Sequence, residues 1–327
     1  MCTLLSLPIE LLLHILQLSL FGNPEPSNVL RLNRYISKLA TDILYTSPHL
    51  ISVESLRKFP ECPKKRPRAL VVDLAGGEVG GGAFRLMCRV FESCLRAPWT
   101  RGVEEQHEGC EDSANETLPL ESLRLCLHST NSPIVDDVSL AALSLVNPKI
   151  FLWTGPDPAH HFSTAIVPAA FDSLVLHFPL WSSLRVLHLA NVAFSPTFSA
   201  STLIPPIPTL ETIHIGQATI LPITPLAALL FHTDARSLSA VQLVDCYVES
   251  IWGPRIRRRD IERAAVDLAT EDFGHRCEDK HTSAYDESCT AAKAQQAVQR
   301  VRCIVRCEVL TERIIGGDRV EGSAILE

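Results

Sequence analysis

The chain has 327 residues, of which 46% are hydrophobic and 20% are charged, and its formal net charge at pH 7 is −7. This composition excludes a largely disordered chain and argues against a dedicated nucleic-acid binder, which needs a basic surface. No apolar stretch is long enough to predict a membrane span, and the eleven cysteines form no Cys-x-x-Cys pair. We therefore expect a reduced, cytoplasmic or nuclear protein with no membrane partner.

The first 45 residues predict three short helices. The first starts with Pro8, which a first helical turn tolerates, and carries an apolar face. That face consists of Leu12, Ile15, Leu16 and Leu20. A break with two prolines (22–28) precedes two further apolar-periodic runs, at 29–33 and 36–44. Three such helices bury too little apolar surface to stand alone, so we expect the module to complete its core against a partner.

This segment resembles an F-box. It has a Leu7-Pro8 start followed by Glu10, an Ile15-Leu16 pair, a Leu-Asn-Arg run at 32–34, and a Leu39–Tyr45 ending similar to fungal members of the family. It departs from the family at Tyr35, where many members carry tryptophan, and in the length of the first break. The resemblance covers residues 1–58.

The resemblance implies a substrate-recognition adaptor of an SCF-type (cullin-RING) ubiquitin ligase. It implies no catalytic residue, because ubiquitin transfer belongs to other subunits, and we expect no cofactor and no metal. The residues that would present an apolar face to a Skp-type adaptor are Leu7, Pro8, Ile9, Leu12, Ile15 and Leu16. Those that would support this face from the second and third helices are Leu30, Leu32, Ile36 and Leu39.

A proline-rich and basic stretch at 59–68 predicts a linker. Beyond it, Ala69–Gly82 predicts a strand and a glycine loop, and a helix follows from Phe84 to Leu95. A glycine loop at a helix N-terminus can bind phosphate or a methyl-donor nucleoside. This keeps open an alternative, an α/β enzyme that binds a nucleotide or methyl donor at Gly76–Gly82. The glycine spacing matches neither a P-loop nor a dinucleotide fingerprint, so we favour a surface loop.

The middle of the chain carries an internal repeat. Leu184–Leu189, Leu210–Ile215 and Leu238–Leu243 share one apolar pattern at a spacing typical of leucine-rich repeats. Weaker copies lie at Leu120–Leu125 and Lys149–Trp153, and apolar helical runs precede several copies, at 138–146, 169–178 and 225–231. The sequence therefore predicts an irregular, leucine-rich-repeat-like α/β solenoid over residues 69–255. An α/β sheet with ordinary crossovers remains the alternative.

The repeat also predicts which side chains point outward. Period-2 alternation buries Leu187, Leu189, Ile213, Ile215, Val241 and Leu243. His188, His214 and Gln242 then occupy the same outward position in successive strands, about 5 Å apart. We expect this polar row to bind the target protein, whose identity the sequence does not give.

Charged residues return in the last segment, 256–327, which we expect to form a cap. The arginine run from Arg255 to Arg259 predicts a charged helix start, and helical spacing follows at 261–268. Alternation at Val301, Cys303, Val305, Cys307 and Val309 predicts a strand, and Gly316-Gly317-Asp318 predicts the turn of a terminal β-hairpin. The gaps between His275, Cys277, His281 and Cys289 fit no common zinc site.

The expected architecture is thus an α/β protein in four parts: a three-helix F-box-like module (1–58), a linker (59–68), a repeat body (69–255) and a charged C-terminal cap (256–327). The expected function is that of a ligase adaptor. A repeat interaction scaffold without a ligase link is a further alternative.

Overall fold

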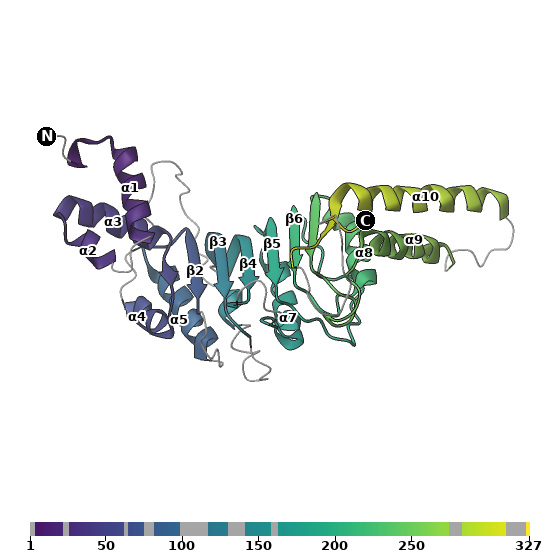
Figure 1. The fold of residues 1–327 in the computed structure, drawn as a ribbon, viewed down its shortest axis with the longest axis horizontal. Coiled ribbons are helices and arrows are strands. Elements are labelled where there is room, and N and C mark those ends of the chain that lie inside the picture. Colours follow the sequence, from purple (N-terminus) through teal and green to yellow (C-terminus); the bar gives the residue numbers. More distant parts are fainter. Residues whose placement is uncertain are drawn as a thin grey trace, which may run out of the picture.

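One open sheet of eight parallel strands runs through most of the computed structural model (Figure 1). The structure describes residues 4–21, 26–61, 65–74, 82–98, 117–129, 141–157, 163–274, 283–311 and 325–327. The strands are β1 (His49–Leu50), β2 (Ala69–Asp73), β3 (Leu118–Cys126), β4 (Val146–Thr154), β5 (Val186–Ala190), β6 (Thr212–Gly216), β7 (Ala240–Val244) and β8 (Val305–Glu308). They lie side by side in chain order, so each strand pairs with the strands before and after it. The predicted α/β class is confirmed.

Helices and short 3₁₀ turns connect the strands and flank the sheet. The helices are α1 (Ile9–Phe21), α2 (Pro26–Leu30), α3 (Arg34–Thr46), α4 (Val53–Lys58), α5 (Gly82–Arg96), α7 (Pro168–Val175), α8 (Ile223–Phe231), α9 (Arg258–Gly274) and α10 (Ser283–Ile304). The 3₁₀ turns are η1 (Leu4–Ser6), η2 (Phe59–Glu61), η3 (Phe178–Leu180) and η4 (Thr233–Ala235). Among the part of the chain that the structure describes, we find no helix with both the length and the apolar character needed to cross a bilayer.

The core lies on one face of the sheet, because each strand buries every second side chain there. The six residues predicted to point inward from β5, β6 and β7 are each 1% exposed, which confirms the alternation. Apolar side chains of α5, α7 and α8 belong to the same buried cluster. The opposite face of the sheet carries half-buried and exposed side chains.

The same turn ends three successive strands. Asn191, Gln217 and Asp245 directly follow β5, β6 and β7, and their φ angles are 60°, 48° and 51°. This left-handed conformation is one that asparagine and aspartate tolerate better than most residues. The Nδ2 atom of Asn191 donates to Oε1 of Gln217 at 2.6 Å, which links two of the turns. The repeated turn gives the strands a common exit geometry.

The N-terminal helices form a small core of their own. Its buried members are Leu12, Leu16, Leu20, Val29, Ile36 and Ala40, and they form a cluster separate from that of the body. The side chain of Asn33 caps α3 by accepting a hydrogen bond from the backbone N–H of Tyr35.

The boundaries of this module differ from those predicted. Strand β1 pairs with β2, and α4 packs against α5, so the helical module ends at Thr46 rather than at residue 58. The described part of the expected linker is packed as well. The ring of Phe59 stacks on Tyr45 at 6.0 Å, and Nε of Arg66 donates to the carbonyl oxygen of Ala97.

The C-terminal segment adds the last strand of the sheet and contributes to the main core. Strand β8 pairs with β7, and Ile261, Val301 and Cys307 are buried in the main core. The predicted strand at 301–309 starts only at Val305, because residues up to Ile304 belong to α10. Cys303, one of the alternating residues of the predicted strand, belongs to α10 and is exposed.

Part of the predicted terminal hairpin lies within the described residues. One antiparallel bridge joins Glu308 to Ile325, and the backbone N–H of Leu326 donates to the carbonyl oxygen of Cys307. The expected turn at 316–318 lies outside the described residues.

A buried ion pair joins the ends of β7 and β8. Nε of Arg255 donates to Oδ1 of Asp245 at 2.8 Å, and the two side chains are 1% and 0% exposed. The other carboxylate oxygen accepts from the backbone N–H groups of Leu310 and Thr311, and Nη2 of Arg255 donates to the carbonyl oxygen of Thr311. Arg255 is therefore a core residue, whereas its sequence context predicted a charged helix start.

Removing the arginine leaves a buried carboxylate without its counter-charge. We expect Arg255→Leu to lower the free energy of unfolding by about 3–5 kcal/mol, as measured by urea denaturation. The control is Arg259→Leu, at an exposed position of α9, which should change it by less than about 0.5 kcal/mol. Equal effects of the two substitutions would show that the pair does not hold this end of the sheet.

Candidate interaction surfaces

One position on the open face recurs in every strand of the sheet. The strand register places eight residues at this position: His49, Val71, Arg124, Leu152, His188, His214, Gln242 and Arg306. We call them the central row. Neighbouring strands lie about 4.8 Å apart, so side chains that follow one another in the row can touch.

The predicted polar row of His188, His214 and Gln242 is confirmed as part of this central row. The imidazole rings of His188 and His214 stack with their centroids 3.9 Å apart and their planes at 20°. Nε2 of Gln242 donates to Oε2 of Glu308 at 2.8 Å. The amide oxygen of Gln242 then faces Nδ1 of His214 at 3.0 Å, so that nitrogen carries the proton.

The environment keeps His188 neutral. Burial lowers the pKa of His188 from 6.5 to about 4, and electrostatic interaction with His214 and Arg124 acts in the same direction. At neutral pH the ring can therefore donate or accept a hydrogen bond and stack on its neighbour without a charge.

Charged residues frame the central row. At the start of the strands, Arg185 pairs with Glu211 at 3.4 Å and Lys149 pairs with Glu121 at 3.4 Å. At the far edge, Arg306 is ion-paired with Glu308. Among the described residues, no group of three or more His, Cys, Asp or Glu side chains is placed to hold a metal ion. The open face thus has the features of a binding surface for polar groups.

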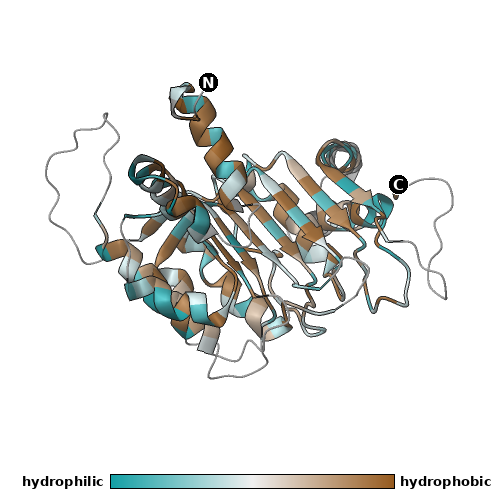
Figure 2. Ribbon diagram, turned by 60° about the vertical axis from the view of Figure 1, so that its left-hand side comes forward, coloured by the Kyte–Doolittle hydropathy of each residue, from teal (hydrophilic) through white to brown (hydrophobic). Residues whose placement is uncertain are grey.

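A second surface lies on α1, where apolar side chains occupy two stripes. Leu12, Leu16 and Leu20 point into the module core. Four others stay in solvent: Ile9 (40% exposed), Leu11 (53%), Ile15 (37%) and Leu18 (63%). Of these, Leu11, Ile15 and Leu18 follow one another at helical spacing on one side of α1, and we call these three the α1 face. Figure 2 shows α1 standing clear of the sheet with most of its length coloured as hydrophobic. Such an exposed apolar stripe is typical of a protein–protein contact.

The structure divides the residues predicted to bind the adaptor. Pro8, Ile9 and Ile15 are exposed and Leu7 is half-buried. Leu12 and Leu16 are each 2% exposed, so they cannot contact a partner. Instead they pack α1 against the other helices of the module. The physical reason is that the α1 sequence is apolar on two sides, and packing against α3 selects the side that is buried.

The residues expected to support the face also divide. Ile36 is buried, and Leu30 and Leu39 pack against the same small core. Leu32 is 66% exposed, so it does not support the first helix from inside the module core. Sequence reasoning missed Leu11 and Leu18. Their spacing of four and three residues around Ile15 is the signal that could have found them.

The glycine-loop alternative falls mostly outside the described residues. The structure confirms the flanking strand and helix as β2 and α5, and α5 begins at Gly82, but residues 75–81 are not described. His275, Cys277 and His281 also lie outside the described residues, as does the side chain of Cys289.

No protein-family model, no curated protein and no solved structure matches this chain.

The low pKa of His188 makes the stability of the fold depend on pH. The unfolded chain takes up a proton on this ring near pH 6.5, whereas the folded chain does so only near pH 4. The free energy of unfolding should therefore fall as the pH drops from about 6.5 to about 4. His188→Gln should reduce this dependence of the free energy of unfolding on pH. Urea denaturation at several pH values between about 4 and about 6.5 measures it. A nuclear magnetic resonance titration of His188 with a midpoint above pH 6 would contradict the argument.

Proposed function

We propose that this chain is a substrate-recognition adaptor of an SCF-type ubiquitin ligase. In this proposal the N-terminal module is an F-box that binds a Skp-type adaptor, and the body is a leucine-rich-repeat-like solenoid that binds the protein to be ubiquitinated. The observation that carries the proposal is the α1 face, an exposed aliphatic stripe on a helical module that has a core of its own.

The energetics of the module support this role. Among the residues that the structure describes, its core contains six buried hydrophobic side chains, which is little for an independently stable unit. Covering Ile9, Leu11, Ile15 and Leu18 with a partner would bury further aliphatic surface at about 25 cal/mol per Å². The F-box-like order of motifs in this segment agrees with such a partner being a Skp-type adaptor.

The body supports the second half of the proposal. Parallel strands in chain order, a repeated left-handed turn after three of them and apolar helices on the buried side are features of a repeat solenoid. Solenoids bind partners on the face that their strands leave open. That face here carries the central row, with its stacked histidines and flanking arginines.

The first test concerns the α1 face. Leu11→Asp together with Leu18→Asp should weaken binding of the purified full chain to a Skp-type adaptor by roughly thirtyfold or more, the effect of losing a contact worth about 2 kcal/mol. Isothermal titration calorimetry measures the affinity. Because both side chains are mostly exposed, the fold should survive, and circular dichroism checks this.

The control is Gln17→Asp. This residue is exposed on α1 and lies on a different side of the helix from Leu11, Ile15 and Leu18, so a charge is added to the same helix outside the apolar stripe. The control should bind like the wild type. If the wild-type chain, shown to be folded, does not bind the adaptor, the ligase role is excluded and the scaffold alternative takes its place.

A second test concerns the central row. Changing His188, His214 and Gln242 together to alanine should remove target proteins that co-purify with the chain under proteasome inhibition, as quantified by mass spectrometry. Adaptor binding of the same variant should stay unchanged, because the row lies on the body and the α1 face on the module. Recovery of the same proteins by the folded variant would exclude the row as the principal target site.

A further inference from the structure

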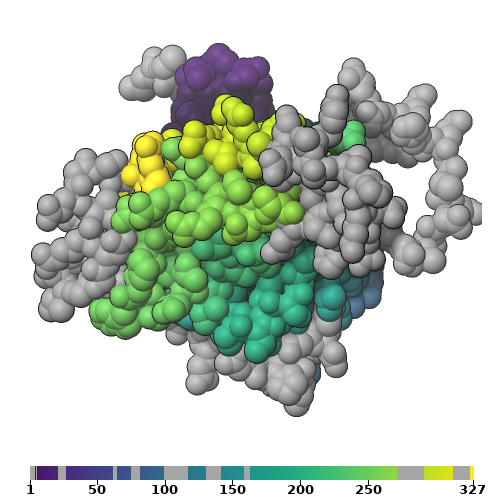
Figure 3. All heavy atoms as spheres, turned by 90° about the vertical axis from the view of Figure 1, so that its right-hand side faces the viewer, coloured from purple at the N-terminus to yellow at the C-terminus, as the bar shows by residue number. Residues whose placement is uncertain are grey.

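A groove of about 1950 Å³ lies at the end of the molecule farthest from the N-terminal module. It is formed where the long connection between β7 and β8 folds into α9 and α10, which extend beyond the sheet (Figure 1). Figure 3 looks at this end, where the two helices lie next to each other above the body. The groove is distinct from both the α1 face and the central row.

Small side chains on three helices create the groove. Helix α9 packs along both α10 and α8, whereas α8 and α10 touch each other little. Five of the lining residues are alanines: Ala228 on α8, Ala265 and Ala269 on α9, and Ala292 and Ala297 on α10. Alanine side chains reach only one atom beyond the backbone, so they leave an open space between the three helices. Helices α8 and α10 form the walls of this groove, and α9 forms its floor.

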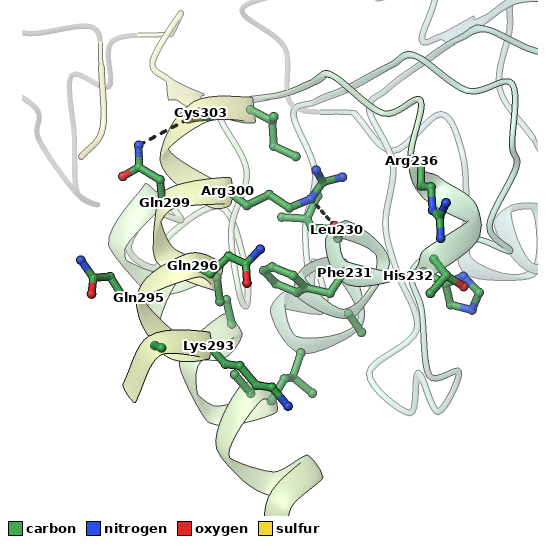
Figure 4. A pocket seen from close by; sticks show the side chains of 18 residues that line it. Leu230, Phe231, His232, Arg236, Lys293, Gln295, Gln296, Gln299, Arg300 and Cys303 are labelled. Carbon is green, nitrogen blue, oxygen red and sulfur yellow. Dashed lines mark hydrogen bonds between the residues drawn. The ribbon is translucent and has the colours of Figure 1, made fainter. Parts of the chain in front are cut away.

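The groove offers an apolar anchor to a ligand. Phe231, the last residue of α8, is 37% exposed, and its ring points into the space between α8 and α10 (Figure 4). Leu268 on α9 and Ile304 on α10 add aliphatic surface. A large exposed aromatic side chain beside small residues is typical of a site that receives apolar side chains from a partner.

The described lining of the groove is basic. Two arginines line it, Arg236 and Arg300, and none of the described residues that line it is acidic. The whole chain has a formal net charge of −7. Nε of Arg300 donates to the carbonyl oxygen of Leu230 at 2.5 Å, which holds its guanidinium group at the wall (Figure 4). Positive charge at an apolar groove favours a ligand that is both acidic and apolar.

We propose that this groove binds an acidic amphipathic helix of a partner protein. Its wall on α10 runs from Ala292 to Ile304, a length of about 18 Å, which matches about 12 residues of a bound helix. Apolar side chains of that helix, spaced three and four residues apart, would contact Phe231 and the alanines. Its carboxylates would lie near Arg236 and Arg300. The proposal does not depend on a role in ubiquitination.

The probe is a synthetic helical peptide of about 14 residues with leucines spaced three and four residues apart and glutamates beside them. Fluorescence anisotropy measures its binding to the full-length protein. We expect it to bind at least about tenfold more tightly than the same peptide with lysine in place of glutamate, and more weakly as salt is raised. It should also bind more tightly than a scrambled peptide of identical composition, which has no apolar stripe.

Variants of the groove separate charge from apolar contact. Arg236→Glu should weaken binding of the acidic peptide by at least about tenfold, and Phe231→Asp should do the same. The matched control is Arg263→Glu, an exposed arginine of α9 that does not line the groove, which should change the affinity less than about twofold. Circular dichroism confirms the fold of each variant.

Three results would overturn the proposal. They are equal binding of the acidic and lysine peptides, unchanged binding by the Phe231→Asp variant, and binding to vesicles rich in phosphatidylserine without binding to the acidic peptide. The last result would assign the groove to a membrane surface instead.

Discussion

The continuous parallel ladder is the constraint on which the rest of the structure depends. A strand can join a parallel neighbour only after the chain has returned to the same end of the sheet, so every step from β1 to β8 needs a crossover. The crossovers bury one face, where α5, α7 and α8 supply the apolar cover. The other face stays open, and in-register pairing aligns one residue of every strand into the central row.

The same ladder explains why the remaining surfaces lie at the two ends. Beyond β1 the chain continues into a helical module with its own core, and beyond β7 it inserts α9 and α10 before it returns as β8. The α1 face, the central row and the groove are therefore separate, and a partner on one need not displace a partner on another. Such separation suits the proposed adaptor role, because an adaptor has to hold its ligase and its target at once.

Polar contacts hold the ladder together where apolar packing stops. Asn191, Gln217 and Asp245 occupy equivalent turns, and the last of them is locked by Arg255 against the chain that leaves β8. A carboxylate and a guanidinium group buried this deeply are stable only as a pair with satisfied hydrogen bonds. The insertion between β7 and β8 thereby gains a rigid base, from which α9 and α10 extend.

The sequence by itself determined the α/β class, the helices before the strands and the inward and outward residues of β5, β6 and β7, because these follow from local periodicity and from one repeated pattern. It also located the polar row of His188, His214 and Gln242. Only the tertiary structure decided which stripe of α1 is buried, since Leu12 and Leu11 are equally apolar and α3 packs against one of them. It placed Val301 in the last turn of α10 and not in a strand, because the packing of this helix on α9 overrides the local alternation. Only the tertiary structure also showed that Arg255 pairs with Asp245. The local sequence could not predict this pair, because nothing in the arginine run distinguishes Arg255 from its neighbours.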